Sequence, residues 1–150
     1  MSDPSRPRVD NLKERLTKQS ATLAERASSL SKRFELLQEW LADFPGKAAA
    51  SVSEERPDED DGVLYIGFSR FGQNWRFLFK YELCSAPPDD NWQPLASASL
   101  RLKLRAVDLL PKLMVAMLGS TEELAVSIDQ ANRKMDALAA SLGADLKEGR

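Results

Sequence analysis

The sequence contains no histidine and a single cysteine, Cys84. Histidine is the side chain that most often serves as a general base and as a metal ligand, so its absence argues against most acid–base and metal-dependent enzymes. One cysteine can form neither an intrachain disulfide nor a cysteine-based zinc site. A hydrolase that uses two carboxylates alone remains the enzyme alternative. We expect a protein that is not an enzyme and that holds no cofactor and no metal.

A long apolar run is also missing. The longest one, residues 109–118, spans about half of the roughly twenty residues that a membrane helix needs, and Pro111 and Lys112 interrupt it. The N-terminal residues contain no apolar leader of the kind found in signal peptides. A single cysteine is typical of a reducing compartment. We therefore expect a soluble cytoplasmic protein with no membrane partner.

The chain has about one domain's worth of residues, 150, and a formal net charge of −2. Its charge is unevenly distributed, because an acidic segment at 45–62 directly precedes a segment in which basic residues outnumber acidic ones. The composition predicts a single domain overall. Its expected parts are a disordered tail at 1–8, an N-terminal amphipathic heptad helix at 9–44, and an α+β core at 45–150 with an acidic loop at 54–62.

The N-terminal helix is predicted from apolar residues that recur every seventh position: Val9, Leu16, Leu23, Leu30, Leu37 and Phe44. The positions four residues later are polar at first, at Lys13 and Ser20, and apolar further on. A straight helix over 9–44 would be about 54 Å long, whereas a compact domain of this size is about 40 Å across. Either the helix projects and pairs with another chain, or it breaks, and the serines of 28–31 are where we expect a break.

A β-hairpin is expected over residues 62–83, with its turn at 71–74. Period-two alternation places Leu64, Ile66 and Phe68 on one face of the first strand. Residues 98–105 alternate alanine or leucine with serine, arginine or lysine, which predicts a third strand over 95–105. Residues 47–53 are a candidate fourth strand. The resulting sheet is a three- to four-stranded antiparallel meander.

The C-terminal third predicts a helical hairpin. Asp108 is the expected N-cap of its first helix, Gly119 the end of that helix, and Ser120 to Glu123 the capping box of the second. The second helix carries another heptad pattern: Leu124, Ile128, Ala131, Met135, Leu138 and Leu142. The fold class is therefore α+β, with a long N-terminal helix, an antiparallel meander sheet and a C-terminal helical hairpin packed on one sheet face.

The two heptad patterns and the length of the N-terminal helix predict a coiled-coil homodimer, and pairing of the two patterns within one chain is the alternative. The residues that we expect at the oligomerisation surface are Leu16, Leu23, Leu30, Leu37, Leu124, Ile128, Met135 and Leu138. The leading functional class is a non-catalytic protein-interaction protein, namely a small dimeric adaptor, chaperone or regulatory inhibitor.

Strand alternation also predicts a basic sheet face: Tyr65, Arg76, Lys80, Arg101, Lys103 and Arg105. Such a face fits an acidic protein partner. The alternative function is a nucleic-acid-binding or polyanion-binding module that uses the same face. A solvated sheet face without a partner would also carry charged residues.

Overall fold

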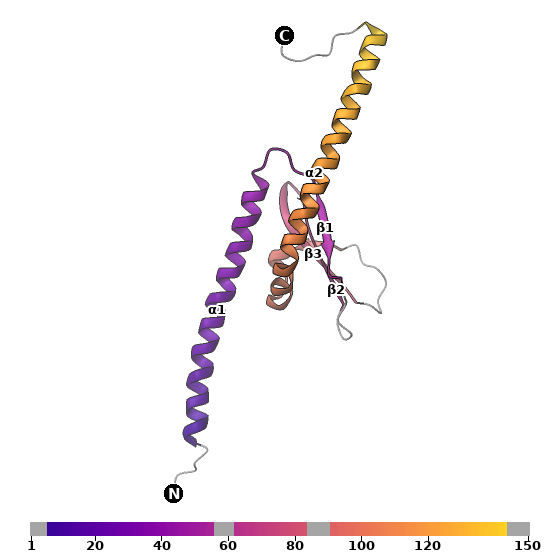
Figure 1. Cartoon of the computed structure of the whole chain (residues 1–150). Coiled ribbons are helices and arrows are strands. Elements are labelled where there is room, and N and C mark those ends of the chain that lie inside the picture. The colour runs from indigo at the N-terminus through magenta and orange to yellow at the C-terminus, as the bar shows by residue number, and fades with distance from the viewer. Residues whose placement is uncertain (1–5, 56–61, 84–90, 144–150) are drawn as a thin grey trace. The chain divides into compact units, whose positions relative to one another are not determined.

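The structure, a computed structural model, describes residues 6–55, 62–83 and 91–143 (Figure 1). The chain divides into two parts, residues 1–43 and residues 44–150, and each is described by itself. Two expectations lie partly outside the described residues, namely the tail at 1–8 and the acidic loop at 54–62, and Cys84 also lies outside them.

The first part is the helix α1, Arg6–Ala42. It begins three residues before the expected start at Val9, and it continues without interruption through the serines of 28–31. The alternative in which the helix breaks at 28–31 is therefore wrong. A serine in a helix costs only a few tenths of a kcal/mol relative to alanine, and the helix-favouring neighbours Ala27, Leu30 and Lys32 outweigh that cost.

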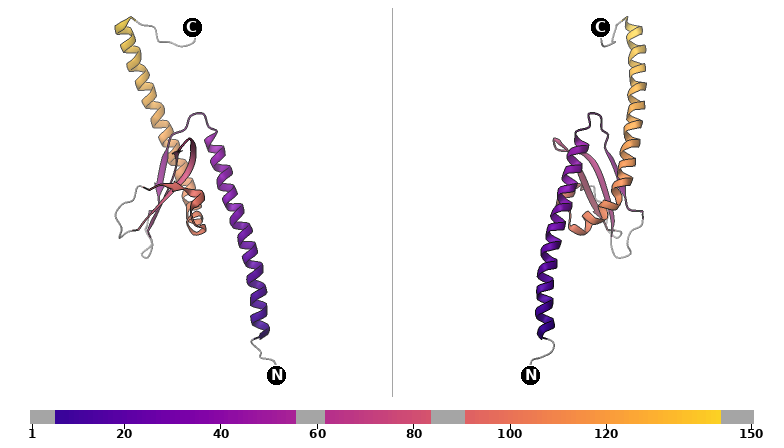
Figure 2. Two further views of the ribbon diagram at one scale, coloured as in Figure 1. Left: turned by 180° about the vertical axis from the view of Figure 1, so that it is seen from behind. Right: turned by 60° about the vertical axis from the view of Figure 1, so that its left-hand side comes forward.

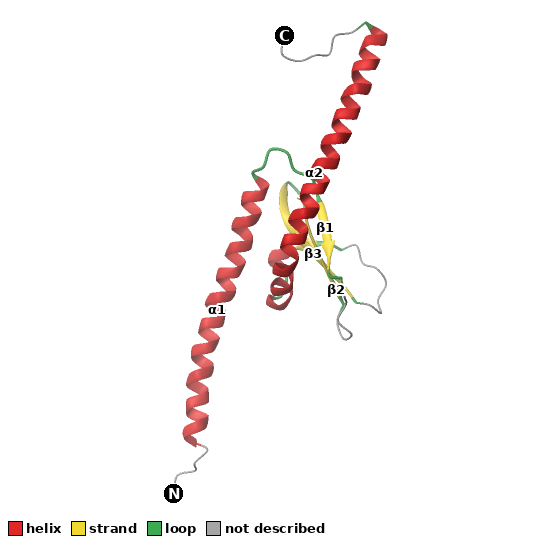
Figure 3. Ribbon diagram, viewed as in Figure 1, coloured by secondary structure: helices red, strands yellow, loops and turns green. Residues whose placement is uncertain are grey.

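The second part contains an antiparallel sheet of four strands in the order β1-β2-β3-β4 (Figure 3). The strands are β1 (Ala50–Ser53), β2 (Val63–Phe71), β3 (Asn74–Glu82) and β4 (Gln93–Pro94). β2 and β3 form the expected hairpin, and Gly72 in its turn has φ of 66°, which favours glycine. The α+β class, the long N-terminal helix and the antiparallel sheet are confirmed.

One face of this sheet forms the core. The register pairs Ile66 with Phe79 and Phe68 with Phe77, so these four side chains share a face, as the alternation predicted. Leu64, Ile66 and Phe68 have no exposed surface. The helix α2, Leu100–Leu142, contacts β1 and β2 and adds the fully buried Leu113. The core therefore lies between the hairpin and α2.

The expected third strand at 95–105 is wrong. A 3₁₀ turn occupies Leu95–Ser97, and α2 begins at Leu100 with Ser99 as its N-cap, whose Oγ accepts a hydrogen bond from the Leu102 amide. Leucine, arginine, lysine and alanine are among the strongest helix formers, and the stretch contains no β-branched residue before Val107. The alternation of residue types was therefore coincidental, and β4 is the only strand within 91–105.

The expected C-terminal hairpin is also wrong, because α2 is one continuous helix of 43 residues. Pro111 lies inside it, and Figure 2 shows the first turns of α2 inclined to its remaining length, as proline inside a helix causes. The hydroxyl of Thr121 donates a hydrogen bond to the Met117 carbonyl one turn back, and this is the pattern of a residue inside a helix. Gly143 ends α2 with φ of 67°.

Among the described residues, neither α1 nor α2 contains a stretch that could span a membrane.

Candidate interaction surfaces

The apolar stripe of α2 is the first candidate surface. Its sheet-packed half buries Ala106, Leu109, Leu113 and Met117. At about 100° per residue, the second-half positions 124, 128, 131, 135, 138 and 142 fall within about 60° of the direction of Leu113. The two patterns therefore form one stripe. Gly119 lies between the two halves, inside the helix and without a positive φ.

The second half of α2 extends beyond the sheet in the views of Figures 1 and 2. Its apolar side chains are about half exposed, for example Ile128 at 52% and Leu138 at 53%. We call this surface the α2 seam and define it by its six positions: Leu124, Ile128, Ala131, Met135, Leu138 and Leu142. An exposed apolar stripe that continues a buried one is typical of a helix that packs against a partner.

The predicted oligomerisation residues of α1 lie at seven-residue intervals along that helix. Leu16 and Leu23 are exposed, while Leu30 and Leu37 are half-buried. Leu36 and Trp40 are also exposed, although neither belongs to the seven-residue series. The apolar surface of α1 is therefore less regular than the α2 seam.

The outer face of the sheet, opposite the core, is the second candidate surface. The register places Tyr65 with Lys80 and Gly67 with Leu78 on this face. The Lys80 ammonium lies 4.7 Å from the Tyr65 ring centroid and 5.1 Å from that of Trp92, and it forms an ion pair with Glu82. A cation between two aromatic rings fixes both rings against the strand surface.

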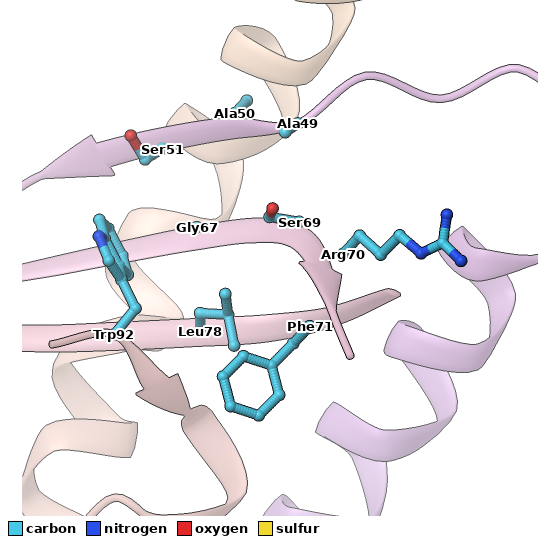
Figure 4. Close-up of a pocket in the computed structure, with 9 residues that line it drawn as sticks. All are labelled: Ala49, Ala50, Ser51, Gly67, Ser69, Arg70, Phe71, Leu78 and Trp92. Atoms are coloured by element: carbon cyan, nitrogen blue, oxygen red, sulfur yellow. The ribbon is translucent and has the colours of Figure 1, made fainter. Parts of the chain in front are cut away.

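Trp92 is the functional candidate that sequence reasoning missed. A Cβ added at Gly67 would lie 3.1 Å from the Ala50 carbonyl oxygen, which is a tight contact, and 3.5 Å from the Trp92 ring, which is an ordinary one, so the indole packs directly over the glycine. A hollow of about 480 Å³ lies beside it (Figure 4). Trp92, Leu78 and Phe71 give it apolar walls, and Ser51 and Ser69 contribute hydroxyls. A glycine within an otherwise aromatic strand was the sequence signal for a close approach.

Arg105 has a different environment from the one predicted. Its guanidinium donates two hydrogen bonds to the Glu54 carboxylate, one of them 2.9 Å from Nε to Oε2, and another to the Gly62 carbonyl. It lies 5.5 Å from the centroid of the Tyr81 ring, whose hydroxyl accepts a hydrogen bond from the Gly62 amide. The hydrogen bond to Glu54, above all, raises the pKa of Arg105 beyond its ordinary value. This network joins α2 to three strand ends.

The six residues of the predicted basic face therefore do not share a surface. Tyr65, Arg76 and Lys80 lie on the outer face of the sheet, whereas Arg101, Lys103 and Arg105 lie on α2. α2 packs on the opposite face, so the expectation of one continuous basic sheet surface is wrong. The cause is the helical conformation of 100–105, which removes the period-two alternation on which that expectation rested.

In the ranges that the structure describes, no group of three or more acidic or cysteine side chains is placed to hold a metal ion. Comparisons with protein-family models, with curated proteins and with solved structures each found no match.

Proposed function

We propose that this protein is a non-catalytic, homodimeric interaction protein of the cytoplasm, in which α2 joins two copies and the outer sheet face receives a protein partner. The observation that carries the proposal is the α2 seam, the half-exposed continuation of a stripe that is buried where it meets the sheet. Covering the exposed half of a leucine or isoleucine contributes about 1 kcal/mol per side chain. Because both copies bury the same residues, each seam position contributes twice to the free energy of dimerisation.

The outer sheet face supports an acidic partner. Arg76 lies on it, next to Lys80, which is only 14% exposed and already paired with Glu82, while Arg70 lies at the far end of the hollow and extends away from Trp92 (Figure 4). Aromatic and arginine side chains around a small apolar hollow are the composition that protein interfaces favour. The nucleic-acid alternative has less support, because the arginines and lysine at 101–105 lie on α2 and not on this face.

Size-exclusion chromatography with light scattering tests the dimer. At tens of micromolar we expect twice the 16.7 kDa mass of the chain. Ile128→Asp should give a monomer, because dimerisation would bury two carboxylates without partners. Val126→Asp is the matched control: Val126 is also β-branched and similarly exposed, at 56%, but lies on the other side of the helix. A monomeric wild type, or equal effects of both variants, would contradict the proposal.

A further inference from the structure

The sheet covers the first half of the apolar stripe of α2, and its position there distinguishes a parallel from an antiparallel pair of α2 helices. We propose, on the basis of the proposed dimer, that the α2 seams of two copies pack antiparallel, with Leu124 of one copy opposite Leu142 of the other. The same register places Ile128 opposite Leu138 and Ala131 opposite Met135. All six layers are then apolar, and the smallest side chain faces the long, flexible methionine.

A parallel pair is sterically disfavoured. The sheet already occupies the stripe at Leu109, Leu113 and Met117, and the seam continues along the same line. In a parallel pair, the sheet-packed half of the partner helix would run into this sheet. In the antiparallel pair, Leu142 of the partner stops opposite Leu124, seven residues or about 10 Å short of Met117. The two sheets then lie at opposite ends of the helix pair.

A second α2 fits the seam better than α1 does. Pairing with α1 would bring Lys13 or Ser20 into the apolar layers, and a polar residue there costs stability. Six positions flank the α2 seam: Ala125, Ser127, Asn132, Lys134, Ala139 and Ser141. All of them except Lys134 are small or uncharged. Small flanking residues allow two helices to approach closely. The exception, Lys134, is exposed, and its long side chain can extend into water.

Spin-label distances on the full-length protein test the orientation. A Cys84→Ser background receives a labelled cysteine at Arg133 or at Glu122, both of which are exposed. In the antiparallel register, the two copies of residue 133 lie at the same level along the axis, whereas the two copies of residue 122 are about 33 Å apart along it. A parallel pair would give similar distances at both positions.

The expected result is a much longer separation at 122 than at 133, and loss of both distances with Ile128→Asp. Similar distances at both positions in a protein of dimeric mass would overturn the antiparallel arrangement and leave the proposed dimer intact. A monomeric mass with no intermolecular distance would overturn both. Dimeric mass that survives Ile128→Asp would show that another surface joins the copies.

Discussion

The ion pair between Arg105 and Glu54 gives the sharpest prediction about stability. Each side chain is 19% exposed, and the two share two hydrogen bonds. Removing one partner of a fully buried pair costs about 3–5 kcal/mol. Because this pair retains some contact with water, we expect Arg105→Met to cost about 2–3 kcal/mol and the coupling between the two residues to be about 2 kcal/mol.

A double-mutant cycle measures this coupling. Glu54→Gln preserves an oxygen that can accept the Leu64 amide hydrogen bond, so this variant removes mainly the charge. The matched control is the pair Lys112 and Glu55, which also joins α2 to the end of β1 but is 46% and 85% exposed. Its coupling should stay below about 0.5 kcal/mol.

The assay is urea unfolding followed by tryptophan fluorescence at one fixed protein concentration, because dimerisation also contributes to stability. In thermal unfolding, a loss of 2 kcal/mol should lower the Tm by about 8 °C. The raised pKa of Arg105 sets the pH dependence. A group whose pKa is raised on folding gives stability that is fully present below its ordinary pKa, and the ordinary pKa of arginine lies well above pH 10, so the coupling should be unchanged between pH 7 and 10. Equal couplings for the two pairs would refute this account.

Three further outcomes follow from the same structure. Gly62→Ala should destabilise the sheet by about 2 kcal/mol, because its Cβ would overlap the Glu82 carbonyl, whereas Gly46→Ala, with no described atom within 4 Å, should be neutral in urea unfolding. Leu23→Asp in α1 should leave the dimeric mass in light scattering unchanged, and a monomer would place the dimer contact on α1 instead. Fluorescence anisotropy with labelled oligonucleotides at about 50 mM salt should show no binding tighter than about 100 μM, since the cations do not form one face.

Local patterns predicted the parts of the fold that local physics controls. The alternation of Leu64, Ile66 and Phe68 against the aromatic residues of β3 is a property of the pleat, and the hairpin has that register. Gly72 supplies the positive φ that its turn requires. The seven-residue spacing in α1 and the four–three spacing in α2 indicated helices because both match the helical period. These features depend on neighbours within a few residues.

The same local rules failed where two patterns competed. Residues 100–105 match a strand by alternation and a helix by propensity, and in the structure they are the first turns of the helix that buries Ala106 and Leu109. Gly119 and the residues after it match a helix end. The helix nevertheless continues, because one glycine inside a helix costs only about 1 kcal/mol relative to alanine and its neighbours Met117, Glu123 and Leu124 favour a helix.

The sequence by itself determined the β-hairpin, the long N-terminal helix and the helical period of the C-terminal third. Only the tertiary structure decided that Arg105 pairs with Glu54, 51 residues away, and that Trp92 lies over Gly67 beside a hollow. The tertiary structure also decided that the α2 seam continues a buried apolar stripe, so that the sheet lies at the N-terminal end of the seam. The physical reason is that each of these depends on which segments pack together, and local periodicity fixes the faces of an element without specifying what those faces meet.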